Sequence, residues 1–235
     1  MSRSRILKAY RTRFHQLLRQ VGARRTEQGV NWLVARAKQI SSRRETPLSA
    51  ALTTTFEDLV SRPAFAPRKR PTPRRPDEIH FFCDSGLGGL ARWLRGAGYD
   101  ALWKPHIADD RLLELARQSS STVLTTDSML MERRVLRDKI IPSFWLPPTL
   151  SIPEQLERVF REFELCVNTP RCMSCGGPLV KTDKEALREQ IPPKTYLWLN
   201  DYFVCARCGK LFWHGTHWKR IMGRLNALAG NCCTQ

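Results

Sequence analysis

Apolar positions in residues 79–163 switch repeatedly between the spacing of strands and the spacing of helices. Short apolar runs predict strands, and apolar residues recurring every three or four positions predict helices. The expected strands are residues 79–83, 99–103, 122–126 and 140–146. The expected helices are residues 87–95, a helix that opens at 109–110, and residues 129–136 and 155–163. Because β and α elements alternate with short links, the fold class is α/β, with a small, mostly parallel sheet flanked by helices.

The beginning of the chain has helical periodicity on a basic background. Apolar residues recur at helical spacing over residues 6–21 and 30–40, and more weakly over residues 48–60. We expect an N-terminal basic helical module of two or three helices in residues 1–60. Its basic faces would either be solvated while the module packs on the main domain or contact RNA, and these two roles are compatible.

A linker and two further regions follow this module. Residues 61–76 hold five prolines and six Lys or Arg, which excludes a helix or an inner strand. This composition predicts an extended basic linker and a domain boundary. The α/β domain is then expected at residues 77–168, and a cysteine-rich region with a basic and aromatic tail at residues 169–228.

Charge is concentrated in the first third of the chain. Residues 1–76 hold 18 Lys/Arg and 4 Asp/Glu, a charge of +14, while residues 77–235 hold 21 and 18, a charge of +3. Such a block predicts a polyanionic partner, most often nucleic acid and less often an anionic membrane surface. With no apolar run near the roughly 18 residues of a membrane span and no signal peptide, we expect a cytoplasmic protein without membrane partners. Residues 1–26, which lack acids, also fit an organelle transit peptide.

Four of the eight cysteines form two Cys-x-x-Cys pairs, Cys172 with Cys175 and Cys205 with Cys208. Each pair is followed by glycine, and two such turns bring four thiolates together around a tetrahedral zinc ion. Four ligands leave no open position, so the pattern predicts a structural site in a zinc ribbon. The 29 residues between Cys175 and Cys205 exceed the usual 15–20 and require an excursion of their own.

Two other chemistries fit the cysteine pairs. A redox pair is disfavoured because neither motif begins a helix in a thioredoxin-like unit, and an iron–sulfur cluster is the other alternative. His214 and His217 are candidate replacement ligands, phosphate contacts or ordinary structural histidines.

Four aspartates are expected at one edge of the sheet. Asp84 follows the first strand, Asp109 and Asp110 open the helix after the second strand, and Asp127 follows the third. Carboxylates gathered at the carboxyl ends of parallel strands repel each other, which predicts Mg²⁺ or Mn²⁺ bound by Asp84, Asp109 and Asp127. In a basic protein, such a centre favours metal-assisted hydrolysis of phosphodiester bonds.

Each aspartate also has a simpler alternative role. Asp109 and Asp127 could cap the helices that follow them. Asp84 is the hardest to explain in this way, because it follows the apolar run Phe81-Phe82-Cys83 directly. Asp100, at the start of the second strand, is either a further acid of the site or a surface residue.

Four motifs in this order resemble one known family. They are Asp84-x-x-Leu87-Gly88-x-Leu90-Ala91-Arg92-Trp93-Leu94-Arg95-x-x-Gly98-Tyr99-Asp100, Asp109-Asp110-x-Leu112-Leu113-x-Leu115-Ala116, Leu124-Thr125-x-Asp127, and the two cysteine pairs ending in Trp213-x-Gly215-Thr216-His217-Trp218. Over residues 79–224 the chain resembles the Mut-seven C-terminal RNase domain family. The resemblance implies a PIN-like nuclease fold with an appended zinc ribbon. It also implies a metal-dependent ribonuclease with Asp84, Asp109 or Asp110, and Asp127 as its catalytic acids.

The chain departs from the family pattern at four positions. Family members usually carry basic residues where this chain has Ser85, Gly89, Thr126 and Ser128. The retained acids favour a metal-dependent ribonuclease that acts on RNA. The missing basic residues favour an alternative, a non-catalytic RNA- or ribosome-binding protein that uses the basic module and the zinc ribbon. A PIN-like toxin with an antitoxin partner is a third hypothesis, and the ribosome and tRNA are candidate partners.

Overall fold

A computed structural model describes residues 3–65 and 78–229 of the chain, which form two compact units. One unit combines residues 3–65 with residues 124–151, and the other combines residues 78–123 with residues 152–229. Most of the predicted linker, residues 66–77, lies outside the described residues.

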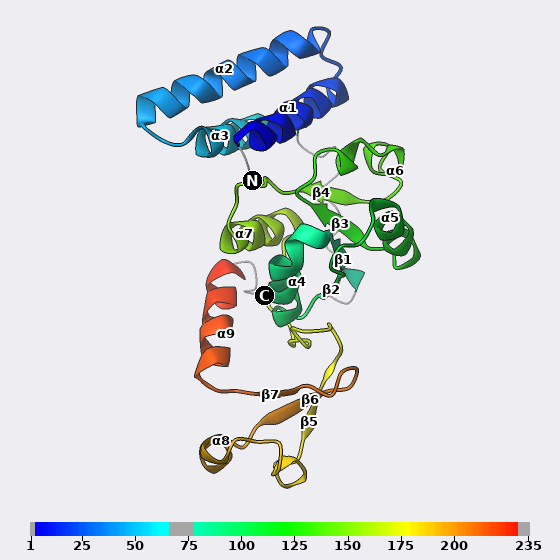
Figure 1. Cartoon of the computed structure of the whole chain (residues 1–235), viewed down its shortest axis with the longest axis vertical. Coiled ribbons are helices and arrows are strands. Elements are labelled where there is room, and N and C mark those ends of the chain that lie inside the picture. Colours follow the sequence, from blue (N-terminus) through cyan, green and yellow to red (C-terminus); the bar gives the residue numbers. More distant parts are fainter. Residues whose placement is uncertain (1–2, 66–77, 230–235) are drawn as a thin grey trace. The chain divides into compact units, whose positions relative to one another are not determined.

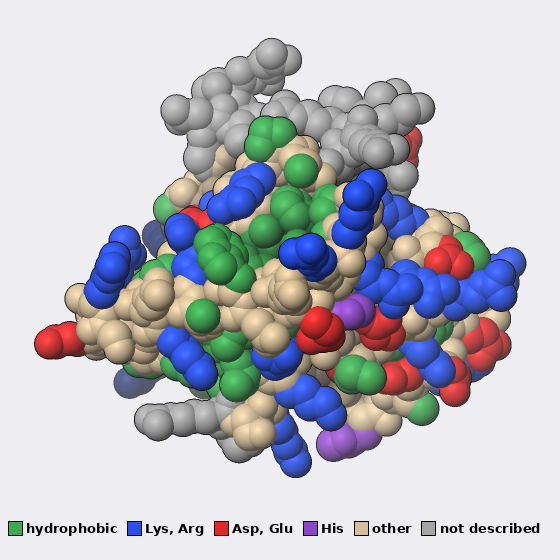
Figure 2. Space-filling model, turned by 90° about the horizontal axis from the view of Figure 1, so that it is seen from above, with side chains coloured by type: hydrophobic (Ala, Val, Ile, Leu, Met, Phe, Trp, Pro, Cys, Tyr) green, Lys and Arg blue, Asp and Glu red, His purple; other side chains and the backbone are tan. Residues whose placement is uncertain are grey.

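The first unit contains the predicted basic module as three helices. They are α1 (Arg3–Gln20), α2 (Thr26–Arg44) and α3 (Leu48–Val60) (Figure 1). Each helix buries one apolar face, as its periodicity predicts, and Tyr10, Phe14 and Phe56 are at most 2% exposed. Lys and Arg side chains are spread over the face of the molecule drawn in Figure 2 rather than gathered in one stripe.

The rest of the first unit follows strand β3 (Thr122–Thr125). The helix expected at residues 129–136 is wrong, because the chain forms a 3-10 turn, Leu130–Glu132, and a short helix, α6 (Arg134–Arg137). Arg133 separates them with an extended backbone (φ −56°, ψ 130°) that no helix accommodates. Strand β4 (Ser143–Trp145) then carries the buried Trp145, whose ring meets those of Tyr10 and Phe56 at centroid distances of 5.5 and 4.8 Å.

The predicted alternation of strands and helices is confirmed. Strands β1 (His80–Cys83) and β2 (Asp100–Trp103) pair in parallel, in the four-stranded sheet of order β2-β1-β3-β4. Helices α4 (Gly88–Gly96) and α5 (Asp109–Gln118) lie on either side of these strands, and α7 (Ile152–Phe163) packs on α4 (Figure 1). The fold class is therefore mixed α/β with a parallel sheet flanked by helices.

The C-terminal region forms a ribbon of three antiparallel strands. These are β5 (Leu179–Thr182), β6 (Tyr202–Cys205) and β7 (Leu211–Trp213), followed by helix α9 (Thr216–Ala229). The expected excursion is confirmed, because a 3-10 turn (Glu185–Leu187) and helix α8 (Pro193–Trp198) lie between β5 and β6. No helix in the described part of the chain has the length and apolar character needed to cross a membrane.

Candidate functional site

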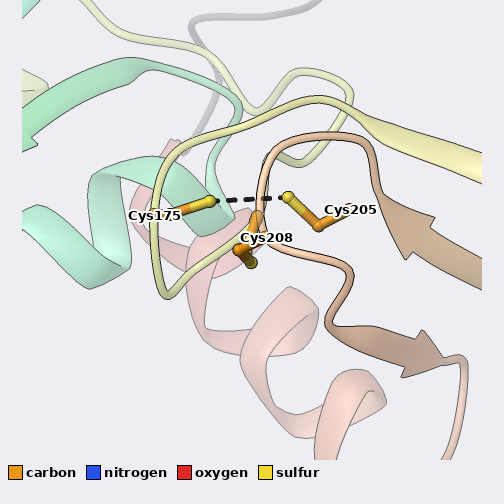
Figure 3. A group of neighbouring side chains, drawn as sticks. Cys175, Cys205 and Cys208 are labelled. Carbon is orange, nitrogen blue, oxygen red and sulfur yellow. Dashed lines mark hydrogen bonds between the residues drawn. The ribbon is translucent and has the colours of Figure 1, made fainter.

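The four predicted zinc ligands come together at one end of the ribbon. The Sγ atoms of Cys172, Cys175, Cys205 and Cys208 all lie within 4.8 Å of one another. Figure 3 shows Cys175, from the loop before β5, pointing toward Cys205 at the end of β6 and Cys208 in the loop between β6 and β7. Sγ–Sγ distances of 3.4 Å (Cys175–Cys205) and 3.7 Å (Cys172–Cys208) are close to the about 3.8 Å that a tetrahedron with Zn–S bonds of about 2.3 Å requires.

The two loops have equivalent backbone geometry. In each, the glycine after the second cysteine donates its N–H to the carbonyl of the first, Gly176 to Cys172 (2.7 Å) and Gly209 to Cys205 (2.9 Å). Both glycines have positive φ, 78° and 68°, which a side chain would strain. Backbone N–H groups also face the sulfur atoms, from Gly177 to Cys175 and from Arg207 to Cys205, both at 3.4 Å. The two Cys-x-x-Cys-Gly sequences therefore form equivalent turns, and the Sγ atoms of both turns face the same space.

Cys172, Cys175 and Cys205 differ in their tendency to ionise. Burial raises the pKa of Cys172, and raises that of Cys175 to about 12. Burial also opposes ionisation of Cys205, but N–H groups of Cys208 and Arg207 and hydrogen bonds from neighbouring thiols lower its pKa to about 6. Several adjacent thiolates need a cation, because like charges so close repel each other. The donor set therefore fits a thiolate-binding metal such as zinc.

Arg95 of α4 fixes the first cysteine loop. Its side chain is 5% exposed, and Nη1 donates to the carbonyl of Ser174 at 2.7 Å while Nε donates to the carbonyl of Ala101 in β2 at 2.7 Å. Burial lowers the pKa of this guanidinium. Sequence reasoning gave Arg95 no role, although an Arg among the apolar residues Leu90, Ala91 and Leu94 was a signal of a buried contact.

The two histidines are not in the metal-ligand group of the described residues. The ring of His214 lies between two aromatic rings instead, Trp218 at 4.9 Å and Phe203 at 4.8 Å between centroids. His217 is exposed in the first turn of α9. The aromatic stack accounts for His214 as a structural histidine.

Asp84 lies directly after β1 and is 9% exposed. Its Oδ1 accepts a hydrogen bond from the N–H of Gly86 at 2.9 Å, which holds the carboxylate at the start of the turn into α4. Trp103, at the end of β2, donates from Nε1 to the carbonyl of Ser85 at 3.1 Å. The ring of Trp103 also covers Gly88, where a Cβ would lie 2.6 Å from Cε2. Nothing in the apolar pattern or the motifs indicates that Trp103 fixes the Asp84 turn.

Asp109 and Asp110 are both exposed and stand in the first turn of α5. The cap position is Ala108, so the alternative role of Asp109 as the helix cap is wrong. Negative charge in the first turn of a helix is nonetheless favourable, because the N-terminal N–H groups carry partial positive charge.

Asp127 follows β3 by two residues and is exposed. Its Oδ1 accepts the N–H of Met129 at 2.7 Å, and its own N–H donates to Oγ1 of Thr125 at 2.9 Å. These bonds fix the direction of the carboxylate. The 3-10 turn that follows has Met129 at its cap position and no side-chain cap bond, so the alternative role of Asp127 as a helix cap is wrong. None of the four aspartates is in the metal-ligand group found among the described residues, which is the cysteine quartet.

Asp100 lies at the start of β2, in register with His80, whereas the candidate acid Asp84 follows the other end of β1. Oδ2 of Asp100 is 3.7 Å from Nδ1 of His80. A Cβ added to Gly176 would lie 3.7 Å from Oδ1 of Asp100. Asp100 thus stands beside the cysteine loop, and not with the candidate acids.

The model of the Mut7-C RNase domain matches residues 79–225, which is more than half of the chain. The chain belongs to this family. The match spans β1 through most of α9 and includes Asp84, Asp109, Asp110 and Asp127 as well as the four cysteines. Searches of curated proteins and of solved structures gave no match. Membership in an RNase-domain family supports a role for the Mut7-C chain in RNA cleavage.

Proposed function

We propose that this Mut7-C protein is a metal-dependent ribonuclease in which Asp84, Asp127 and either Asp109 or Asp110 bind Mg²⁺ or Mn²⁺. The observation that carries the proposal is Asp84, a carboxylate that is 9% exposed and follows β1 within a chain segment matched by an RNase-domain model. Burying a carboxylate costs free energy unless hydrogen bonds or positive charge compensate it. The Gly86 N–H supplies one bond, and a bound divalent cation would add positive charge beside the carboxylate.

The donors fit a hard cation. Mg²⁺ and Mn²⁺ prefer oxygen ligands, and one or two protein carboxylates together with substrate phosphate are typical of such centres. A bound divalent ion polarises a phosphate and lowers the pKa of a coordinated water. The chain contributes fixed carboxylates: Oδ1 of Asp84 is held by Gly86 and Oδ1 of Asp127 by Met129, each through one backbone N–H. Fixed ligands lower the cost of organising a charged site.

Asp84→Asn separates catalysis from structure. Asparagine can still accept the Gly86 N–H bond, but it removes the negative charge that would bind the ion. We expect Mg²⁺- or Mn²⁺-dependent cleavage of total RNA to fall by about 100-fold or more, while the circular dichroism spectrum and RNA affinity persist. The matched control is Glu114→Gln, which removes an acid from the exposed side of α5, where Glu114 pairs with Arg111, and should leave cleavage unchanged.

A second candidate function is favoured by a separate observation. The positions at which the family usually carries basic residues hold Ser85, Gly89, Thr126 and Ser128. A non-catalytic RNA- or ribosome-binding protein needs no cations beside a scissile phosphate. If Asp84→Asn cleaves as well as the wild type, or if the wild type shows no divalent-dependent cleavage, this binding function replaces the ribonuclease proposal.

We further propose that the ion of the cysteine quartet is a structural zinc. The fit of the Sγ–Sγ distances to Zn–S bonds and the four-sulfur donor set support it. Four protein ligands would leave no position for substrate, so the role of this ion is to stabilise the ribbon.

A further inference from the structure

The N-terminal module contacts the loop that carries Asp127 through one buried side chain. Gln16 of α1 is 7% exposed, and its Nε2 donates to the carbonyl of Ser128 at 2.9 Å and to Oε1 of Glu132 at 2.7 Å. Both contacts lie within the first compact unit. Ser128 follows Asp127, and the 3-10 turn Leu130–Glu132 closes the same loop. One side chain of α1 therefore holds the loop at both its beginning and its end.

Gln16 is itself fixed by a neighbour on α1. Nη1 of Arg13 donates to Oε1 of Gln16 at 2.9 Å, and this determines that the Nε2 end of the amide faces the loop. The guanidinium of Arg13 lies 5.9 Å from the ring centroid of Trp145. Trp145 in turn donates from Nε1 to the carbonyl of Thr126 at 3.2 Å. The carbonyls on both sides of Asp127, those of Thr126 and Ser128, are thus bound by groups that contact α1 or belong to it.

A second group of contacts joins the same helix to the segment after β4. The hydroxyl of Tyr10 lies 2.7 Å from Oγ1 of Thr53 and 3.0 Å from Oγ1 of Thr149. Thr53 and Thr149 are 2.7 Å apart. Tyr10 is fully buried against the ring of Trp145. Residues 124–151 therefore contact α1 over about two of its turns, from Tyr10 to Gln16, and not at one point.

The side chain at position 128 is consistent with this packing. Ser128 is 4% exposed, whereas the family resemblance leads one to expect a basic residue there. A Lys or Arg at so buried a position would lose the hydration of its charge, which is costly without a partner. A small residue is compatible with α1 lying over the loop. The departure from the family pattern at position 128 then follows from the packing of α1 on this loop.

We infer that α1 supports the catalytic site, with Gln16 as a positioning residue that fixes the loop carrying Asp127. The inference rests on the proposed ribonuclease function. Ligands are effective when neighbouring side chains hold them within about 0.5 Å of the productive geometry. Asp127 is exposed, and within its own loop it is oriented by bonds to Met129 and Thr125. The N-terminal module anchors that loop from outside the matched family domain, residues 79–225.

The test compares full-length Gln16→Ala with Gln20→Ala, which removes an exposed amide from the same helix. We expect Gln16→Ala to lower kcat for RNA by about 10-fold to 100-fold, with KM for RNA little changed. The Mn²⁺ concentration for half-maximal activity should rise several-fold. A merely structural role would lower activity only in proportion to the folded fraction, without moving the Mn²⁺ dependence. Gln20→Ala should match the wild type in all of these.

A second measurement does not depend on activity. The Met129 amide donates to Oδ1 of Asp127, so its hydrogen exchange reports whether the loop is held. We expect faster exchange at Met129 in Gln16→Ala than in Gln20→Ala. Unchanged exchange, or unchanged kcat and Mn²⁺ dependence in an active protein, overturns the inference. If the wild type has no divalent-dependent cleavage, the ribonuclease proposal fails, and the exchange experiment then decides separately whether α1 anchors the loop.

Discussion

Trp103 explains why a glycine begins α4. A Cβ on Gly88 would lie 2.6 and 2.7 Å from Cε2 and Cζ2 of the indole ring, closer than packed carbon atoms approach. The ring cannot move freely, because its Nε1 donates to the carbonyl of Ser85. That carbonyl belongs to the residue after Asp84. The side chain at the end of β2 thus determines both the sequence of the turn and the position of the candidate ligand.

Gly88→Ala tests this coupling. The added methyl group should displace the Trp103 ring and break its bond to Ser85, so we expect a loss of about 1–3 kcal/mol in the free energy of unfolding. Urea titration followed by tryptophan fluorescence measures the loss. The control is Gly223→Ala in α9, where nothing lies within 4 Å of the added Cβ. There alanine should be neutral or stabilise by up to about 1 kcal/mol. Equal effects of the two substitutions would contradict the role of Trp103.

At the scale of elements, the cysteine ribbon and the sheet are held together by Arg95. Its guanidinium bonds to Ala101 in β2 and to Ser174 in the first cysteine loop. The backbone of the same residue accepts the N–H of Arg171 at 2.9 Å. The ribbon nevertheless has a separate small core of three buried residues with five partly buried ones packed on them: Leu187, Ile191 and Tyr202, and Tyr196, Leu199, Val204, Leu211 and Trp213. So small a core supplies little stability, which makes bound metal a large part of the folding free energy of the ribbon.

Cys205→Ser should therefore unfold the ribbon locally. We expect the zinc content to fall from about one ion per chain to near zero, because a hydroxyl is a poor replacement for a thiolate. Hydrogen exchange should accelerate over residues 172–215 and remain slow in β1 and β2. Cys83→Ala is the control: this buried thiol lies in β1 and is not in the quartet, so the substitution should keep the zinc. Iron in the purified protein, or full zinc content in Cys205→Ser, would contradict the assignment.

The sequence predicted the elements whose pattern is local. Strands β1 and β2 begin only one residue later than expected. Their positions were predictable because buried apolar runs define them directly. Helix α7 starts at Ile152 and not at residue 155, since Pro153 fits its first turn. The prediction of a helix over residues 129–136 was wrong, because the spacing of the apolar residues does not indicate the extended backbone at Arg133. The two cysteine turns were predictable because their chemistry is encoded within four residues each.

At the scale of the whole molecule, contacts between distant residues were beyond sequence reasoning. Gln16 and Ser128 are 112 residues apart, and nothing in the polarity of either one indicates the other. The same holds for Arg95 and Ser174, 79 residues apart. Apolar periodicity and basic composition did predict that residues 1–60 form basic helices, but they left open whether those helices pack, bind RNA or do both. The contacts of Tyr10, Arg13 and Gln16 show that the helices pack on residues 124–151. Binding of RNA by the module can therefore be tested without deleting it.

The exposed cations of the module should contribute to RNA affinity. Arg24, Arg25 and Lys38 are exposed, and replacing all three with Gln leaves the buried faces of α1 and α2 intact. For single-stranded RNA the slope of log K against log salt is about −0.7 for each phosphate neutralised, so we expect the slope to flatten by up to about 2.

The control triple is Arg111→Gln, Arg134→Gln and Arg137→Gln, which removes the same charge from cations that pair with Glu114 and Asp138. Because these cations already have acidic partners, their loss should change the slope less. An identical slope in the first triple and the wild type, measured by fluorescence anisotropy over a salt series, would mean that these three side chains are only solvated. Helices α1–α3 would then serve the molecule through packing alone.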